Sequence, residues 1–74
     1  MKLDRITINP ARMNGQPCIR DLRLTVKRVL DILSIYLSWE ELRVEYPELE
    51  REDVRQALLY ASSSLENHRL PITP

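Results

Sequence analysis

Apolar residues follow two different spacings along the chain, and the change between them falls near residue 25. Before that point, segments rich in β-branched residues surround the pair Asn14-Gly15. Both residues tolerate a positive φ, so this pair is a strong turn signal. The flanking segments 5–8 and 18–26 are therefore expected to be short strands or extended arms, within a β arm over residues 1–25.

After residue 25 the apolar residues fall at helical spacing and predict a first helix. Thr25 is a suitable N-cap, because its hydroxyl can accept a hydrogen bond from the first turn. We expect the helix to end near Leu37 and to pack an apolar stripe into the core. The stripe consists of Val26, Val29, Leu30, Leu33, Tyr36 and Leu37.

Two further helices are predicted, with a tight turn between them. At the start of the first of these, Ser38 and Glu41 form a capping box, in which Ser38 accepts from the Glu41 backbone and the Glu41 side chain reaches back. Pro47 ends this helix, because the residue before a proline disfavours the α region. The last helix follows Leu49. Its apolar stripe consists of Val54, Ala57, Leu58, Ala61 and Leu65.

The whole pattern predicts a mainly α domain, a three-helix helix-turn-helix with a short N-terminal β arm or hairpin. Residues 1–66 form this single domain, and residues 67–74 form an extended or disordered tail. A chain of 74 residues buries little surface by itself, so a homodimer is expected. The sequence leaves open whether the arm pairs within one chain or swaps between two copies.

Composition and motifs limit the cellular compartment and the kinds of chemistry that we expect. The single cysteine, Cys18, excludes an internal disulfide and fits a reducing cytoplasm. No signal peptide or membrane span is apparent. There is no nucleophile motif, phosphate loop or metal-ligand spacing, so we expect neither an enzyme nor a bound cofactor or metal.

The net charge is zero, but the two halves of the chain have opposite charges. Residues 1–30 carry a formal charge of +5 and residues 31–74 a charge of −5. An anionic partner is therefore expected at the N-terminal half. The acidic half either faces a basic protein or is a solvated surface.

Two groups of residues are candidates for DNA contacts. In a helix-turn-helix the start of the second helix of the unit enters the major groove, and here that region carries Arg51, Arg55 and Gln56. The acidic neighbours in the same turn oppose phosphate. A second basic group suits the DNA backbone or, alternatively, protects a strand edge from aggregation. It consists of Arg20, Arg23, Lys27 and Arg28.

Several linked motifs resemble a small prokaryotic family called domain of unknown function 433. The most specific pieces are Gly15-Gln16-Pro17-Cys18-Ile19-Arg20 and Tyr46-Pro47-Glu48-Leu49. The segments 23–26, 38–42 and 53–61 continue the resemblance, which covers about residues 5 to 61. One departure is Asp21-Leu22, where the family usually has Gly-Thr. This change lowers the positive charge of the arm.

The resemblance implies a winged-helix-like or homeodomain-like fold and an antitoxin of the VapB type. Such an antitoxin binds a PIN-like ribonuclease toxin and represses its own operon as a dimer. On this hypothesis Leu65, Leu70 and Ile72 contact the toxin and fold on binding. The alternative is a protein-interaction module without DNA binding, which the zero net charge and the acidic start of the last helix favour.

Overall fold

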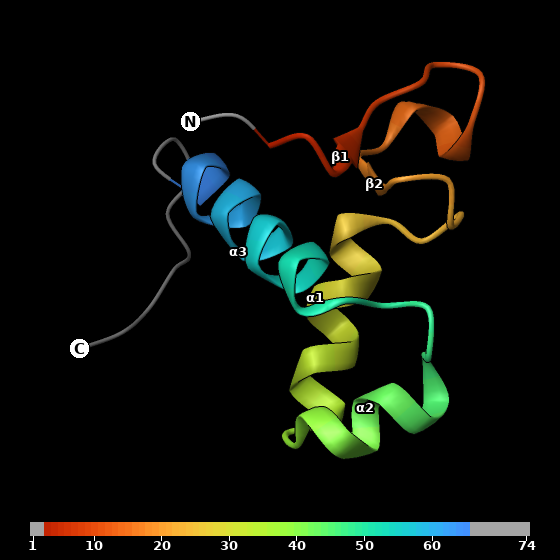
Figure 1. Cartoon of the computed structure of the whole chain (residues 1–74). Coiled ribbons are helices and arrows are strands. Elements are labelled where there is room, and N and C mark those ends of the chain that lie inside the picture. Colours follow the sequence, from red (N-terminus) through yellow and green to blue (C-terminus); the bar gives the residue numbers. More distant parts are fainter. Residues whose placement is uncertain (1–2, 66–74) are drawn as a thin grey trace.

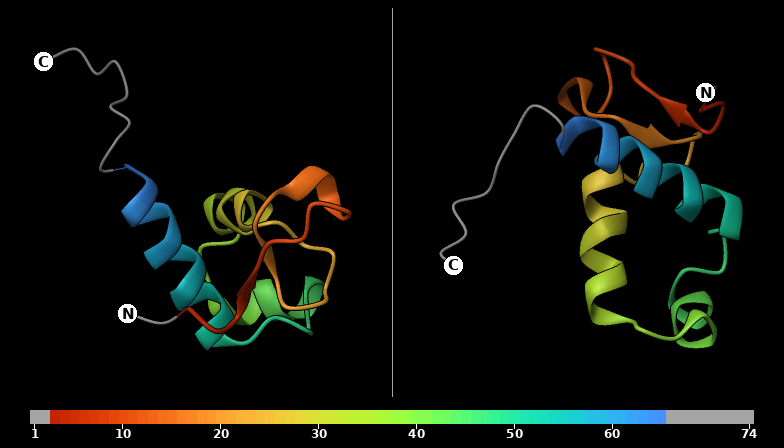
Figure 2. Two further views of the ribbon diagram at one scale, coloured as in Figure 1. Left: turned by 90° about the horizontal axis from the view of Figure 1, so that it is seen from above. Right: turned by 90° about the vertical axis from the view of Figure 1, so that its left-hand side faces the viewer.

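The computed structural model describes residues 3–65, which form three helices and a small β-hairpin (Figure 1). In chain order the elements are β1 (Ile6–Thr7), the 3-10 turn η1 (Met13–Gly15), β2 (Cys18–Ile19), α1 (Val26–Ile35), α2 (Trp39–Glu45) and α3 (Arg51–Leu65). α3 crosses the N-terminal half of α1, with the hairpin at that end of α1 and α2 at the other (Figure 2). The predicted mainly helical fold with an N-terminal hairpin is confirmed.

The hairpin is antiparallel, with Ile6 opposite Ile19 and Thr7 opposite Cys18. Its connection contains the predicted Asn-Gly turn. Asn14 has a φ of 58° there, in the left-handed region that asparagine tolerates better than most residues. Ile19 is fully buried, so the hairpin contributes directly to the core.

The expected extended segment after β2 is instead interrupted by a turn. Arg20 and Arg23 have φ values of 45° and 56°, and these left-handed residues reverse the chain. The reversal brings Thr25 into a bridge with Cys18, and the Ile19 N–H donates to the Leu24 carbonyl at 2.8 Å. β2 is therefore short because the chain folds back on it.

α1 begins as the sequence predicts. The Thr25 hydroxyl accepts from the Arg28 N–H at 3.0 Å, and Val26 and Val29 of the predicted stripe are buried. The helix ends at Ile35, two residues before the expected end. Leu37 consequently lies outside the helix and is 89% exposed, so its assignment to the core stripe is wrong.

The start of α2 is capped by Ser38, whose hydroxyl accepts from the Glu41 N–H at 3.3 Å as predicted. The return bond expected from the Glu41 side chain is not among the hydrogen bonds of residues 3–65. Instead, the Ser38 hydroxyl donates to Glu40 at 3.0 Å. A bond from its own backbone N–H and this hydroxyl hold the pKa of Glu40 below its ordinary value.

α3 packs inward through part of the predicted apolar stripe, together with two polar residues. Asp53, Gln56 and Ala57 are buried on that face. Of the predicted apolar stripe, Ala57 is buried and Val54 packs against the core, whereas Leu58 and Leu65 are 49% and 55% exposed and do not belong to the core. The physical reason is a set of polar contacts at the start of α3 that sets the rotation of the helix. Across the described residues, no helix has the length and apolar character needed to cross a membrane.

Candidate functional site

The polar contacts at the start of α3 centre on Asp53, whose carboxylate is fully buried. Arg20 binds it through two parallel bonds, from Nε to Oδ1 at 3.0 Å and from Nη2 to Oδ2 at 2.6 Å. Arg5 Nη1 donates to Oδ1 at 3.1 Å, and the Glu50 N–H donates to Oδ2 at 3.0 Å. We call Asp53, Arg5, Arg20 and Glu50 the Asp53 cluster. It joins both strands of the hairpin to the first turn of α3.

The environment of Asp53 keeps its carboxylate ionised. Burial by itself raises the pKa of Asp53 and is the largest single influence on it. The hydrogen bonds from Arg20, from the Glu50 N–H and from Arg5 together outweigh burial and hold this pKa below its ordinary value. The same contacts raise the pKa values of Arg5 and Arg20. The cluster is therefore a charged clamp at neutral pH.

Gln56, one turn further along α3, makes a second tie to the N-terminal segment. Its Oε1 accepts from the Arg5 N–H at 2.8 Å. Its Nε2 donates to Asp4 and to Glu52, both at 2.8 Å. Two of the residues predicted to contact DNA, Arg20 and Gln56, thus have their polar groups engaged inside the domain.

The other predicted cations of the N-terminal half lie on the surface. Lys27 pairs with Asp31 of the same helix at 2.9 Å. Arg28 lies 3.5 Å from the Tyr46 hydroxyl. Arg23 is exposed, and its side chain has no hydrogen-bond or ion-pair partner among the described residues. Arg23 and Arg28 thus remain accessible to an anionic partner.

Around Trp39, at the beginning of α2, two arginines from different helices stack on the indole. The guanidinium carbon of Arg51 lies 5.0 Å from the ring centroid, and that of Arg43 lies 5.9 Å from it. Neither arginine has an ion-pair partner among residues 3–65. Arg55, one turn after Arg51, pairs with Glu52 at 3.0 Å. The ring therefore holds two available cations at the start of the helix pair.

Arg43 is not among the residues that the sequence predicted to contact DNA. It lies four residues after Trp39, the spacing at which two side chains on one helix face meet. That spacing between an aromatic residue and an arginine was the available signal. The contribution of Arg51 to the same ring, in contrast, depends on how α2 and α3 pack together.

Next to these arginines lies a groove between α2 and α3 of about 520 Å³. Its lining combines an apolar floor with two cations at one end, and consists of Trp39, Arg51, Val54, Arg55, Leu58, Leu59 and Ser62. We call it the α3 groove. It contains the exposed Leu58 that the sequence assigned to the core.

A second groove of about 290 Å³ lies between α1 and α3. It is lined by Pro17, Val26, Lys27, Leu30, Tyr60, Ala61, Ser64 and Leu65. Leu65, predicted to contact a partner protein, lies here and is more than half exposed. The other two residues of that prediction, Leu70 and Ile72, lie outside the described residues.

Among residues 3–65, no three His, Cys, Asp or Glu side chains gather closely enough to hold a metal ion. The features that the described chain does offer are exposed arginines and apolar grooves on a small helical domain. The fold and these features define a class of small helical domain in which exposed arginines lie beside apolar grooves.

Within this class, the chain belongs to the family described as "Protein of unknown function (DUF433)", whose model matches residues 6–61. The matched region starts at β1 and ends within α3, so it includes the Trp39 arginines and all of the Asp53 cluster except Arg5. Comparison with curated proteins and with solved structures finds no match.

Proposed function

We propose that this domain is an antitoxin-like DNA-binding regulator, which neutralises a PIN-like ribonuclease and represses its own operon as a homodimer. The observation that carries the DNA-binding part is the pair Arg43 and Arg51 on Trp39. Both lie against an aromatic ring, and neither forms a close ion pair with a carboxylate of the described residues. The parts of the proposal that concern the ribonuclease and the operon rest on the resemblance of the sequence to its family.

The position of these arginines fits the way in which helix-turn-helix proteins meet a duplex. The start of the second helix of the unit contacts base edges, while the first helix crosses the backbone. α3 begins at Arg51, and Arg43 lies in the last turn of α2. We assign base or phosphate contacts to Arg51 and Arg55, and phosphate contacts to Arg43. Gln56 has no free amide group for base reading, because its bonds hold the hairpin.

Fluorescence anisotropy with the duplex upstream of the gene tests this assignment at two salt concentrations. The variants Arg43→Gln and Arg51→Gln should each weaken binding by about 1 to 3 kcal/mol. Each lost phosphate contact should reduce the salt dependence by a slope of about 0.9. Lys27→Gln is the matched control, because it removes the same charge from a residue already paired with Asp31.

Two results would overturn the DNA-binding part. One is a lack of binding to the duplex at low salt. The other is an equal loss of affinity in Lys27→Gln and in the two arginine variants, because the affinity would then follow net charge and not the Trp39 arginines. Circular dichroism of each variant checks that the fold is retained.

A second candidate, a protein-interaction module without DNA binding, is favoured by a different feature. Three apolar residues of α3 form an outer stripe with two exposed leucines, namely Leu58, Ala61 and Leu65. Their spacing of three and four residues places them along one side of the helix. An apolar helix side of this kind suits the groove or helix of a partner protein.

Co-expression with a PIN-like ribonuclease encoded beside the gene separates the two candidates. If the module binds only protein, a stable complex should form while the duplex is not bound. The double variant Leu58→Ser, Leu65→Ser should then lose the complex and keep its helical content. A complex that survives this double variant would contradict the role of the outer stripe.

A further inference from the structure

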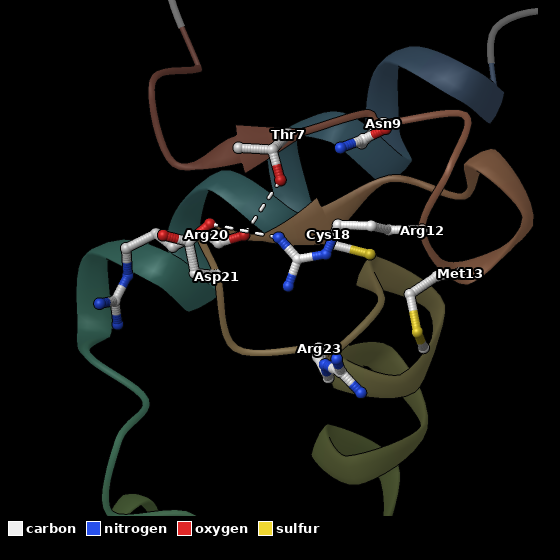
Figure 3. Close-up of a pocket in the computed structure, with 8 residues that line it drawn as sticks. All are labelled: Thr7, Asn9, Arg12, Met13, Cys18, Arg20, Asp21 and Arg23. Atoms are coloured by element: carbon white, nitrogen blue, oxygen red, sulfur yellow. Dashed lines mark hydrogen bonds and ion pairs between the residues drawn. The ribbon is translucent and has the colours of Figure 1, made fainter.

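The hairpin encloses a small cavity on the side away from α3, with a volume of about 120 Å³. This is room for several water molecules. The cavity is lined by Thr7, Asn9, Arg12, Met13, Cys18, Arg20, Asp21 and Arg23, and Figure 3 shows these side chains. We call it the hairpin cavity. None of the contacts proposed above for α2 and α3 involves it.

Two guanidinium groups are available at the hairpin cavity. Arg23 has no polar partner among residues 3–65, and Arg12 has one weak ion pair, 3.5 Å from Asp21 Oδ1. The Asp21 side chain is 94% exposed, so water screens this pair strongly. Arg20 contributes its backbone and the stem of its side chain, while its guanidinium runs away from the cavity to Asp53 (Figure 3).

The walls of the cavity are held in place before any ligand arrives. The Thr7 hydroxyl donates to the Arg20 carbonyl at 3.0 Å, across the two strands. The Asn9 side-chain oxygen accepts from the Ala11 N–H at 2.9 Å, so its amide NH₂ keeps its donors free of the described residues. Two of the residues that carry or support the cations, Arg20 and Arg23, have left-handed φ values. Strained backbone of this kind is found where the fold presents a functional group.

We propose that the hairpin cavity binds a phosphate group, held by the guanidinium groups of Arg12 and Arg23 with the amide of Asn9 as a further donor. Planar guanidinium groups match the oxygen geometry of phosphate and can each form two parallel bonds to it. The Asp21 carboxylate competes with phosphate for Arg12, because it pairs with this arginine when phosphate is absent. A free phosphate ion and the backbone phosphate of a nucleic acid share this chemistry.

A titration with inorganic phosphate, followed by backbone amide NMR at constant ionic strength, tests the proposal. We expect saturable shifts confined to the hairpin, and sodium chloride should not reproduce them. Arg12→Gln and Arg23→Gln should each weaken binding roughly tenfold or more. Asp21→Asn should strengthen it by about two- to fivefold, because the competing carboxylate is gone. Lys27→Gln is again the matched control and should bind phosphate like the wild type.

Equal shifts in phosphate and in chloride would overturn the proposal, as would unchanged affinity in Arg23→Gln. The amide spectrum itself shows whether each variant is folded. A competition experiment with duplex DNA distinguishes free phosphate from backbone phosphate as the ligand. If the cavity takes backbone phosphate, free phosphate competes with the duplex, and Arg23→Gln weakens duplex binding. If Arg43→Gln and Arg51→Gln leave duplex binding unchanged while phosphate still binds the hairpin, the proposed function fails and the cavity proposal stands.

Discussion

α1 and α3 both carry apolar residues at helical spacing, but the most deeply buried side chains of α1 are all apolar, whereas those of α3 include two polar ones. The buried face of α1 contains Val26, Val29 and Ile32, which are almost inaccessible to solvent. The buried face of α3 contains Asp53 and Gln56 beside one alanine, while Leu58 and Leu65 are about half exposed. Two helices of one small core are thus oriented by different forces.

The difference shows that a few strong polar contacts can set the rotation of a helix so that part of its apolar stripe stays exposed. A buried carboxylate is tolerated only when it is paired and hydrogen-bonded, because desolvation costs several kcal/mol. Asp53 meets this condition only if its side of α3 faces the hairpin arginines. Leu58 and Leu65 of the outer stripe are then left about half exposed.

Removing the Asp53 carboxylate tests this difference between the two helices most directly. Asp53→Ala should lower the free energy of unfolding by about 3 to 5 kcal/mol, because Arg5 and Arg20 lose their shared partner. The total stability of so small a domain is on the order of 5 kcal/mol, so most of the variant should be unfolded or close to it. Urea unfolding followed by circular dichroism measures the loss.

The matched control for this prediction is Asp31→Asn. Asp31 also pairs with a cation, Lys27, but both side chains are largely exposed. Such a pair contributes at most about 0.5 kcal/mol, so the control should unfold nearly like the wild type. A similar loss of stability in both variants would contradict the role given to the Asp53 cluster.

The second prediction compares one apolar truncation on each helix. Ile32→Ala on α1 should cost about 2 to 5 kcal/mol, because it leaves a cavity in a fully buried position. Leu58→Ala on α3 should cost less than about 1 kcal/mol in the monomer, since half of that side chain is already in water. The two midpoints of thermal unfolding, measured at low protein concentration, give the comparison.

An equal cost for both truncations would mean that Leu58 belongs to the core after all. A cost for Leu58→Ala that grows with protein concentration would instead sharpen the comparison. It would show that the outer stripe is covered by a second copy, since stability coupled to association depends on concentration.

The elements of the fold were predictable because local chemistry dictates them. Thr25 and Ser38 cap their helices as expected, and the turn before α3 follows from Pro47. The end of α1 and the turn after β2 were harder to predict from the sequence. Arg20 and Arg23 adopt left-handed conformations that their residue types do not indicate, and a long-range contact to Asp53 helps to hold one of them.

The candidate site was predictable only as a set of residue types. The sequence identified Arg51 and Arg55 at the start of α3, and both are exposed there. It could not separate Arg20 and Gln56 from them, because whether a polar residue faces solvent depends on the partners that the fold brings within reach. Those partners are 33 and 51 residues away along the chain.

The smallest expected effect is a dependence of stability on pH, which isolates the charge of Asp53 from its packing. The pKa of Asp53 is lowered in the folded state, so the unfolded chain takes up a proton first as the pH falls. The stabilisation is therefore complete above the ordinary aspartate pKa of about 4 and is lost progressively below it, toward the lower folded pKa. The loss should be smaller than that in Asp53→Ala, because a protonated carboxyl keeps its volume and some of its hydrogen bonds. Urea midpoints measured between neutral and acidic pH should fall more steeply for the wild type and Asp31→Asn than for Asp53→Asn. Parallel curves for all three proteins would show that the ionised cluster does not stabilise the attachment of the hairpin to α3.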